Sequence, residues 1–472
     1  AYINSNGPLL VSGTHGYAGG LFIGTNLTGT LGIEGQLTTT TATLGNSAGA
    51  SGSVSVSGIW SLGGALYVGN EGDGAVTVTG GDVSAGTTYL GAGLGGSGTL
   101  TVESNGSFGT GGLYIGYAGT GGAPGAVGGD GTLTVTSGDV STDVAVIADG
   151  VGSTGTATIS GSSSSMTNAG AFVVGGGGVG SLVVENGATV DNSVSATIGN
   201  LASSAGSSIV VRGAGSTLQD TGALIVGNSG AATLRIENQA TATSNGSIIG
   251  RHSTSSATVT GTGSEWSTGD LRIGGDSNDA GGTSGDGTLN VTAGGEVTST
   301  SARLGDVAGM EGEAIVDGAS SRWEVTSGSL EIGRSGSGSV TIRNGATLET
   351  IHALLGSNAG AEGTATITGT GSSWAASGNI YVGNVGNGDL SVLNGATVTS
   401  AAGYIGTDAA SNSSVTINGA SSEWSMTEPF IAGYMGDATV TLGAGGRISA
   451  LQGTLGDMAG SSGTMTVTGA GS

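Results

Sequence analysis

The chain of 472 residues contains 103 Gly, only 3 Pro and no Cys, and its charged residues make up 9 % of the total. It carries 9 basic against 33 acidic residues, a formal net charge of −24. This charge disfavours nucleic acid and anionic membrane surfaces as partners, since both are themselves negative. The absence of Cys excludes disulfides and thiolate metal sites, and no apolar run approaches the roughly 20 residues that span a bilayer.

A short apolar landmark that ends in Gly recurs along the chain, as in Leu66-Tyr67-Val68-Gly69. Its outer two residues are apolar, while the middle one ranges over Tyr, Val, Ile, Arg and Glu. This alternation predicts a β-strand whose outer pair faces the core and whose middle residue faces solvent. The large form of the landmark begins at Leu21, Leu66, Leu113, Phe172, Leu224, Leu271, Leu330, Ile380 and Phe430.

A second form of the landmark starts with a smaller residue and alternates with the first. It begins at Ala42, Ala196, Ala302, Gly403 and Gly453. The true period is therefore about 50 residues, with each half of roughly 25 residues, a size that suits one coil of a β-solenoid.

After each landmark comes a Gly-rich corner and then a second alternating strand, shown well by 132–136 and 364–368. A third short strand follows, as in 296–300, and Asn-Gly pairs at the corners suit left-handed backbone conformations. Three short strands per coil predict an all-β fold, a parallel β-helix of about 18 coils.

From the landmark at Leu66 onward, one bulky residue precedes the Gly of each large landmark by eight to ten positions. A regular column of this kind indicates a structural core, because large apolar groups at a repeated position are normally buried. The alternative is an exposed aromatic stripe that stacks on sugar rings. The column consists of Trp60, Phe108, Met166, Leu218, Trp266, Trp323, Trp374 and Trp424.

The segment 257–266, with the pattern Ala-Thr-Val-Thr-Gly-Thr-Gly-Ser-Glu-Trp, leads into the landmark at Leu271. It resembles the repeats of autotransporter (type V secretion) passenger domains, of the kind shared with PEP-CTERM-associated surface proteins. The resemblance covers nearly the whole chain. It implies a right-handed parallel β-helix at the outer surface of a Gram-negative bacterium or released from it.

We expect residues 1–20 to form an irregular N-terminal coil and residues 21–472 to form one continuous β-solenoid. The chain stops at Gly469–Ser472, which elsewhere leads into the bulky column, so the solenoid is expected to end in mid-coil. Membrane attachment would then require a translocator that this chain does not include.

Few residues carry catalytic chemistry. The three His residues, His15, His252 and His352, lie far apart and lack recognisable partners, and the acidic residues are scattered over many coils. We therefore expect no enzyme, no cofactor and no catalytic residues.

The richest acidic stretch, 275–286, contains Asp276, Asp279 and Asp286, weak candidates for Ca²⁺ ligands. Its spacing matches no known calcium motif, and a solvated loop has the same composition. This stretch and the insertion 117–130 follow the same strand of their coils, so both are expected on one side as a binding face.

The leading functional hypothesis is a surface-displayed or secreted adhesin or stalk that mediates attachment, aggregation or biofilm. Its expected partners are glycans or proteins of a host or neighbouring cell, or further copies of the chain. The alternatives are a structural fibre or surface-layer component without a specific ligand, and a glycan-processing β-helix enzyme. Carboxylates gathered in one groove would favour the enzyme.

Overall fold

The computed structural model describes residues 1–4, 9–16, 19–117, 128–279 and 285–472. The described chain is all-β apart from the short 3-10 turn η1 (Ala202–Ser204). The predicted fold class is confirmed: parallel strands stack as a β-solenoid, with about 18 turns of about 25 residues in the chain as a whole. The chain forms two compact units, which are described separately: unit 1 comprises Ala1–Arg235 and Gln239–Thr243, and unit 2 comprises Ile236–Asn238 and Ser244–Ser472.

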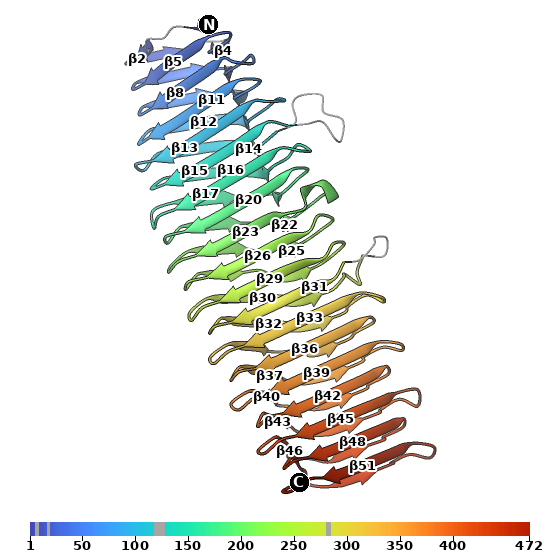
Figure 1. Ribbon diagram of the computed structural model, residues 1–472. Helices are drawn as coiled ribbons and strands as arrows, with labels where there is room; N and C mark the ends of the chain where they lie inside the picture. Colours follow the sequence, from blue (N-terminus) through green and yellow to red (C-terminus); the bar gives the residue numbers. More distant parts are fainter. Residues whose placement is uncertain (5–8, 17–18, 118–127, 280–284) are drawn as a thin grey trace. The chain divides into compact units, whose positions relative to one another are not determined.

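Each coil contains three strand segments, and the stacked segments define three faces in each unit (Figure 1). In one coil of unit 2, β36 (Ser337–Arg343) lies on face 1, β37 (Thr347–Thr350) on face 2 and β38 (His352–Leu355) on face 3. Face 1 is the predicted second strand, face 2 carries the bulky column, and face 3 carries the landmark. In some coils the face 2 and face 3 segments join into one strand of nine residues, such as β12 (Asp82–Leu90).

Unit 1 begins with strands that belong to the stack: β1, β2 and β3 lie within residues 1–20 and pair in parallel with β4, β5 and β6. Its face 1 strands are β2 (Leu9–Val11), β5 (Thr28–Ile33), β8 (Ser51–Val56), β11 (Asp73–Thr79), β13 (Ser97–Glu103), β15 (Asp130–Thr136), β17 (Thr154–Ser160), β20 (Val179–Glu185) and β23 (Ser207–Arg212). Its face 2 strands are β3 (Thr14–Gly16), β6 (Gln36–Thr39), β9 (Ile59–Leu62), β18 (Ser165–Asn168), β21 (Thr189–Asn192), β24 (Thr217–Asp220) and β27 (Thr241–Thr243). Its face 3 strands are β1 (Tyr2–Ile3), β4 (Gly20–Ile23), β7 (Thr41–Leu44), β10 (Ala65–Val68), β19 (Phe172–Val174), β22 (Ala196–Ile198) and β25 (Ala223–Val226), and β12, β14 (Ser107–Ile115) and β16 (Asp139–Ile147) cover both faces.

Unit 2 repeats this arrangement; β26 (Ala232–Glu237) is divided between the two units, and the chain belongs to unit 2 throughout from Ser244 onward. Besides β36, its face 1 strands are β29 (Ser255–Thr260), β31 (Gly287–Thr292), β33 (Glu311–Asp317), β39 (Glu362–Thr368), β42 (Asn387–Leu393), β45 (Asn412–Asn418), β48 (Asp437–Gly443) and β51 (Ser462–Thr468). Besides β37, its face 2 strands are β34 (Arg322–Val325), β40 (Ser373–Ala376), β43 (Thr397–Ser400), β46 (Glu423–Met426) and β49 (Arg447–Ser449). Besides β38, its face 3 strands are β28 (Gly246–Ile249), β35 (Ser329–Ile332), β41 (Ile380–Val382), β44 (Gly403–Ile405), β47 (Phe430–Ala432) and β50 (Gly453–Leu455), and β30 (Glu265–Ile273) and β32 (Glu296–Leu304) cover both faces.

The landmark ends in Gly because the corner that follows it has no room for a side chain. Gly333 has a positive φ of 69°, and a Cβ at this position would lie 2.0 Å from the carbonyl oxygen of Glu362 in the next coil. Close stacking of the coils and a left-handed backbone conformation thus both require Gly here.

The two-coil period has a physical cause at the corner between faces 1 and 2. In the coil with the corner Gly419-Ala420-Ser421-Ser422, the buried hydroxyl of Ser422 donates to the carbonyl of Asn418 at 2.9 Å. The same hydroxyl accepts a hydrogen bond from the Gly395 N–H of the preceding coil, also at 2.9 Å. The preceding coil has the Asn-Gly corner, Asn394-Gly395, so the two corner types form one hydrogen-bonded pair.

The core follows the same period. The indole N–H of Trp323 donates to the hydroxyl of Ser299 in the preceding coil at 3.2 Å, and Trp374 and Trp424 make equivalent bonds to Thr350 and Ser400. Each Trp stacks against a smaller aliphatic residue, as Trp323 does on Val297. Alternation of large and small side chains fills the interior evenly.

Candidate functional site

A column of buried polar side chains lies at the bend between faces 2 and 3 of unit 1. We call it the bend column: Thr110, Thr142, Asn168, Asn192 and Asp220. Each member bonds to the backbone two residues further on, as Thr142 Oγ1 does when it donates to the Val144 carbonyl at 2.8 Å. These bonds therefore stabilise the change of backbone direction at the bend, where regular strand pairing is interrupted.

The last three members of the bend column form a ladder of side-chain hydrogen bonds. Asn168 Nδ2 donates to Asn192 Oδ1 at 2.8 Å, and Asn192 Nδ2 donates to Asp220 Oδ1 at 3.0 Å. Burial raises the pKa of Asp220, although hydrogen bonds from Gly222, Ala196 and Asn192 act in the opposite direction. Because the Asn168 Nδ2 group also donates to the Gly170 carbonyl, the orientation of this amide is fixed.

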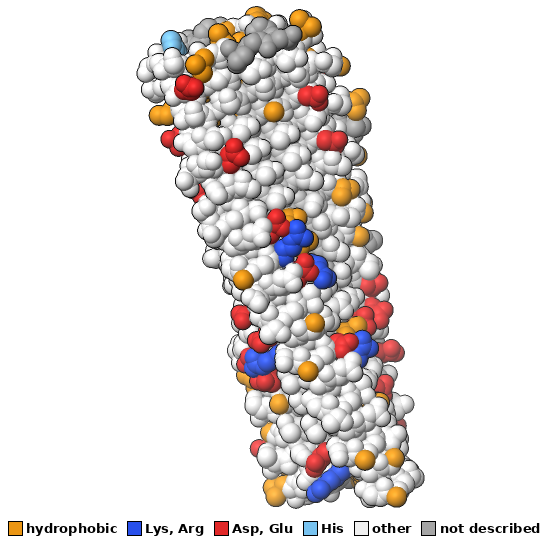
Figure 2. Space-filling view, turned by 60° about the vertical axis from the view of Figure 1, so that its left-hand side comes forward, with side chains coloured by type: hydrophobic (Ala, Val, Ile, Leu, Met, Phe, Trp, Pro, Cys, Tyr) orange, Lys and Arg blue, Asp and Glu red, His pale blue; other side chains and the backbone are white. Residues whose placement is uncertain are grey.

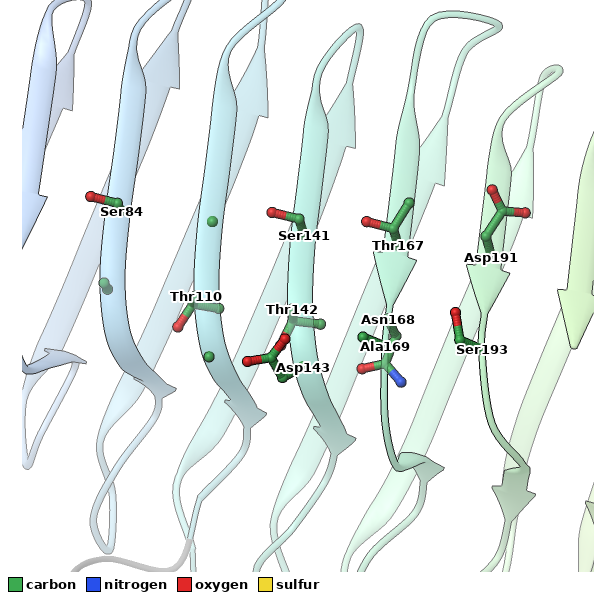
Figure 3. Close-up of a pocket in the computed structure, with 13 residues that line it drawn as sticks. Ser84, Thr110, Ser141, Thr142, Asp143, Thr167, Asn168, Ala169, Asp191 and Ser193 are labelled. Atoms are coloured by element: carbon green, nitrogen blue, oxygen red, sulfur yellow. The ribbon is translucent and has the colours of Figure 1, made fainter. Parts of the chain in front are cut away.

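A groove of about 430 Å³ lies over this bend in unit 1, and we call it groove 1. Ser141, Thr167 and Asp191 form a row on three successive strands on its face 2 side, and Ser84 lies in the same row two strands before Ser141, with Gly109 between them (Figure 3). Hydroxyl, amide and carboxylate groups dominate its lining, and Asp143 and Asp191 are its two ionisable lining residues. Such a lining suits a ligand that is itself rich in hydrogen-bonding groups.

Two acceptors at groove 1 have no hydrogen-bond partner among the described residues. They are Asn168 Oδ1, in a residue that is 1 % exposed, and the buried Asp191 Oδ1. Burial raises the pKa of Asp191, since a charged carboxylate is poorly solvated there. Buried polar groups are nearly always satisfied, so these two acceptors require donors from outside the chain, which ordered water or the hydroxyl groups of a ligand supply.

Unit 2 has a groove at the same position of the coil, groove 2, with a volume of about 510 Å³. Its acidic lining residues, Glu324 and Glu349, are both paired with Arg322. The guanidinium of Arg322 donates twice to Glu349, at 3.0 and 2.8 Å, and these bonds lower the pKa of that carboxyl. The carboxylates of groove 2 are therefore paired with one Arg outside its lining, whereas Asp143 and Asp191 of groove 1 form no ion pair among the described residues.

The structure places the whole bulky column in the interior. Trp60, Trp266, Trp323, Trp374 and Trp424 are all 0 % exposed, and the same holds for Phe108, Met166 and Leu218. None of these rings is available to stack on a sugar.

Aromatic residues do line the outer side of face 3, but mostly as stacked ladders. In unit 1 the rings of Tyr67 and Tyr89 stack at 4.9 Å, and those of Tyr89 and Tyr114 at 5.3 Å. In unit 2, Tyr381 and Tyr404 stack at 5.3 Å. The ring faces inside a ladder are occupied by neighbouring rings, which leaves edges and hydroxyl groups for a partner.

The candidate calcium ligands of unit 2 are engaged by the protein itself. Asp276, 6 % exposed, pairs with Arg272 and Arg251, and Asp279 pairs with Arg251 and His252 at 2.9 Å each. Asp286 Oδ1 accepts a hydrogen bond from the backbone N–H of Glu311 at 2.9 Å. Within the described ranges, no three His, Cys, Asp or Glu side chains gather in a group that could hold a metal ion. Most of the insertion 117–130, and residues 280–284, lie outside the described residues.

The three His residues are not brought together. His15 is exposed on β3, and His252 bonds to Asp279. His352 Nδ1 accepts from the Asn379 N–H at 3.0 Å. None of the three lines groove 1 or groove 2.

Sequence reasoning missed groove 1. Its signal is present two positions after Phe108, Met166 and Leu218 of the bulky column, and two positions after Val140 and Val190, which hold the equivalent place in the intervening coils; the bend column follows there. An alignment of the coils on the bulky residue would have shown polar side chains at a position that alternation assigns to the core.

No protein-family model matches this chain, and no curated protein matches it significantly. In the part of the chain that the structure describes, we find no helix with the length and apolar character needed to cross a membrane.

Proposed function

We propose that this chain is the adhesin or stalk region of a bacterial surface protein, displayed or secreted, that attaches to glycans or proteins of other cells. The observation that carries the proposal is groove 1, a polar groove with two unsatisfied acceptors on a scaffold of repeated coils. Groove 2 occupies the same place in unit 2. The resemblance of the repeats to autotransporter passenger domains supports an extracellular location at a Gram-negative surface.

The surface chemistry supports attachment through hydrogen bonds. Uncharged groups predominate on the face shown in Figure 2, and Arg side chains lie beside acidic ones. Arg212, for example, pairs with Glu185 at 2.6 Å, and Arg343 with Asp317 at 2.9 Å. With most basic groups paired within the chain, little positive charge is left for an anionic partner.

The alternative function is glycan cleavage. Its candidate catalytic groups would be the two carboxylates of groove 1. Asp143 and Asp191 belong to strands two coils apart, so their Cα atoms are separated by about 9–10 Å along the stack. Retaining glycosidases hold their carboxyl groups roughly 5–5.5 Å apart, well below this Cα spacing, whereas inverting ones hold them roughly 6.5–9.5 Å apart, a range whose upper end the Cα spacing reaches. The lining contains no His, Lys or Arg to assist proton transfer. Binding without cleavage is therefore the function we favour.

The test uses beads coated with the purified chain and mixed with bacterial and animal cells. We expect aggregation of at least one cell type, reduced when surface glycans are oxidised with periodate or surface proteins are removed with protease. Beads coated with albumin are the control. Absence of aggregation with every cell type would reject the adhesin proposal, and new reducing ends in added polysaccharide would favour the enzyme.

A further inference from the structure

We propose that groove 1 binds an extended glycan without anionic groups, which lies along the stacked coils and donates hydroxyl hydrogen bonds to Asn168 and Asp191. This inference rests on the proposed attachment function and names the class of ligand. It depends on three observations: the unsatisfied acceptors, the charge of the lining and the repetition of the lining along the coils.

The acceptors define what the ligand must supply. The Nδ2 group of Asn168 is held by two acceptors, Gly170 O at 2.7 Å and Asn192 Oδ1 at 2.8 Å. The amide cannot be reversed without losing both bonds, so its unsatisfied atom is an oxygen. Asp191 Oδ1 is likewise buried and unsatisfied among the described residues. Both positions therefore require donors, and sugar hydroxyl groups are donors.

The charge of the lining selects among glycans. Asp143 and Asp191 contribute two carboxylates, and no lining residue is cationic. The formal net charge of −24 adds a repulsive field for any anionic polymer. Uronic acids and sulfated sugars are thus disfavoured, and uncharged sugars are favoured.

The repetition of the lining favours a polymer over a compact ligand. The row presents short polar groups on three successive strands, Ser141, Thr167 and Asp191, as Figure 3 shows, and Ser84 continues it beyond Gly109. Neighbouring strands are separated by about 4.7–4.9 Å, so an extended chain that runs along the stack meets a polar group at each step from Ser141 to Asp191. Because the Tyr rings stack on one another, hydrogen bonds rather than ring stacking are expected to dominate recognition.

The experiment compares two substitutions on the same coil. Thr167 is exposed in the row of groove 1, and Thr156 is exposed on face 1 of that coil. Thr167→Arg places a long side chain in the groove, and Thr156→Arg is the matched control with the same change in charge. Asp191→Ala removes one acceptor.

Binding of cellohexaose, xylohexaose, mannohexaose and a galacturonic acid hexamer is measured by isothermal titration calorimetry. We expect at least one neutral hexasaccharide to bind the parent chain and Thr156→Arg equally. Binding should weaken at least tenfold in Thr167→Arg and in Asp191→Ala, with circular dichroism unchanged. No binding of any neutral sugar, preference for the galacturonic acid hexamer, or equal affinity in all variants would overturn the inference. If cells still aggregate on beads coated with Thr167→Arg, the inference fails while the adhesin proposal stands.

Discussion

Substitution of Ser299 by Ala removes the acceptor of the Trp323 indole N–H. No other side-chain hydrogen bond of Ser299 is lost among the described residues. The two side chains belong to consecutive coils of unit 2, both are 0 % exposed, and the Nε1 to Oγ distance is 3.2 Å. The variant thus isolates one hydrogen bond of the two-coil repeat.

The expected magnitude follows from burial. Ser299→Ala leaves a buried donor unsatisfied, which costs about 1–3 kcal/mol of the free energy of unfolding. Trp323→Ala costs about 3–5 kcal/mol, because it also leaves a cavity in the core. In a double-mutant cycle of Ser299→Ala with Trp323→Phe, we expect a coupling energy of about 1 kcal/mol.

The matched control is Trp266→Phe in the same unit. Trp266 is equally buried, but its Nε1 has no hydrogen-bond partner within the described residues. This substitution therefore costs less than Trp323→Phe. Urea unfolding followed by circular dichroism, with hydrogen exchange of β32 and β34, measures the differences. Equal losses for the two Phe variants, or a stability of Ser299→Ala equal to that of the parent, would refute the role assigned to this bond.

Three further predictions concern the corner, the ion pairs and calcium. Ser422→Ala leaves the Gly395 N–H and the Asn418 carbonyl without their buried partner, so urea unfolding should show a loss of about 1–3 kcal/mol, and no loss would contradict the corner pairing. The pKa of Asp270 is lowered by Ser301, Arg272 and Arg303 despite the opposing effect of burial. The Asp270 carboxylate therefore contributes fully to the free energy of unfolding above the pKa of an unfolded Asp, about 3.9. This contribution is lost as the pH falls through the lower pKa of the folded state. The test compares the melting temperatures of Arg303→Gln and the parent chain between neutral and acidic pH. The difference between the two should disappear at the lowest pH, and a difference that persists there would argue against this contribution of Asp270. Millimolar Ca²⁺ should leave the melting temperature unchanged, because Asp276 and Asp279 are paired with Arg side chains, and a clear rise would restore the calcium hypothesis.

The sequence by itself determined the coil. Strand alternation, Gly after each landmark and the regular bulky column are local patterns that repeat, so one coil predicts the next. Even the two-coil period was visible, because large and small landmarks alternate. A repeat fold of this kind depends on contacts between neighbouring coils, and these contacts require similar residue types at the same positions of every repeat.

Only the tertiary structure decided which polar groups meet across the coils. The Ser422 corner, the Trp323 bond and the ladder from Asn168 to Asp220 each join residues 23 or more positions apart, as the 24 positions between Trp323 and Ser299 illustrate. The pairing of Asp276 and Asp279 with Arg251 likewise depends on where the corner places these side chains. Whether a hydroxyl or carboxylate is satisfied by the chain or left for a ligand depends on distances of a few tenths of an ångström. Composition and spacing along the chain do not contain that information.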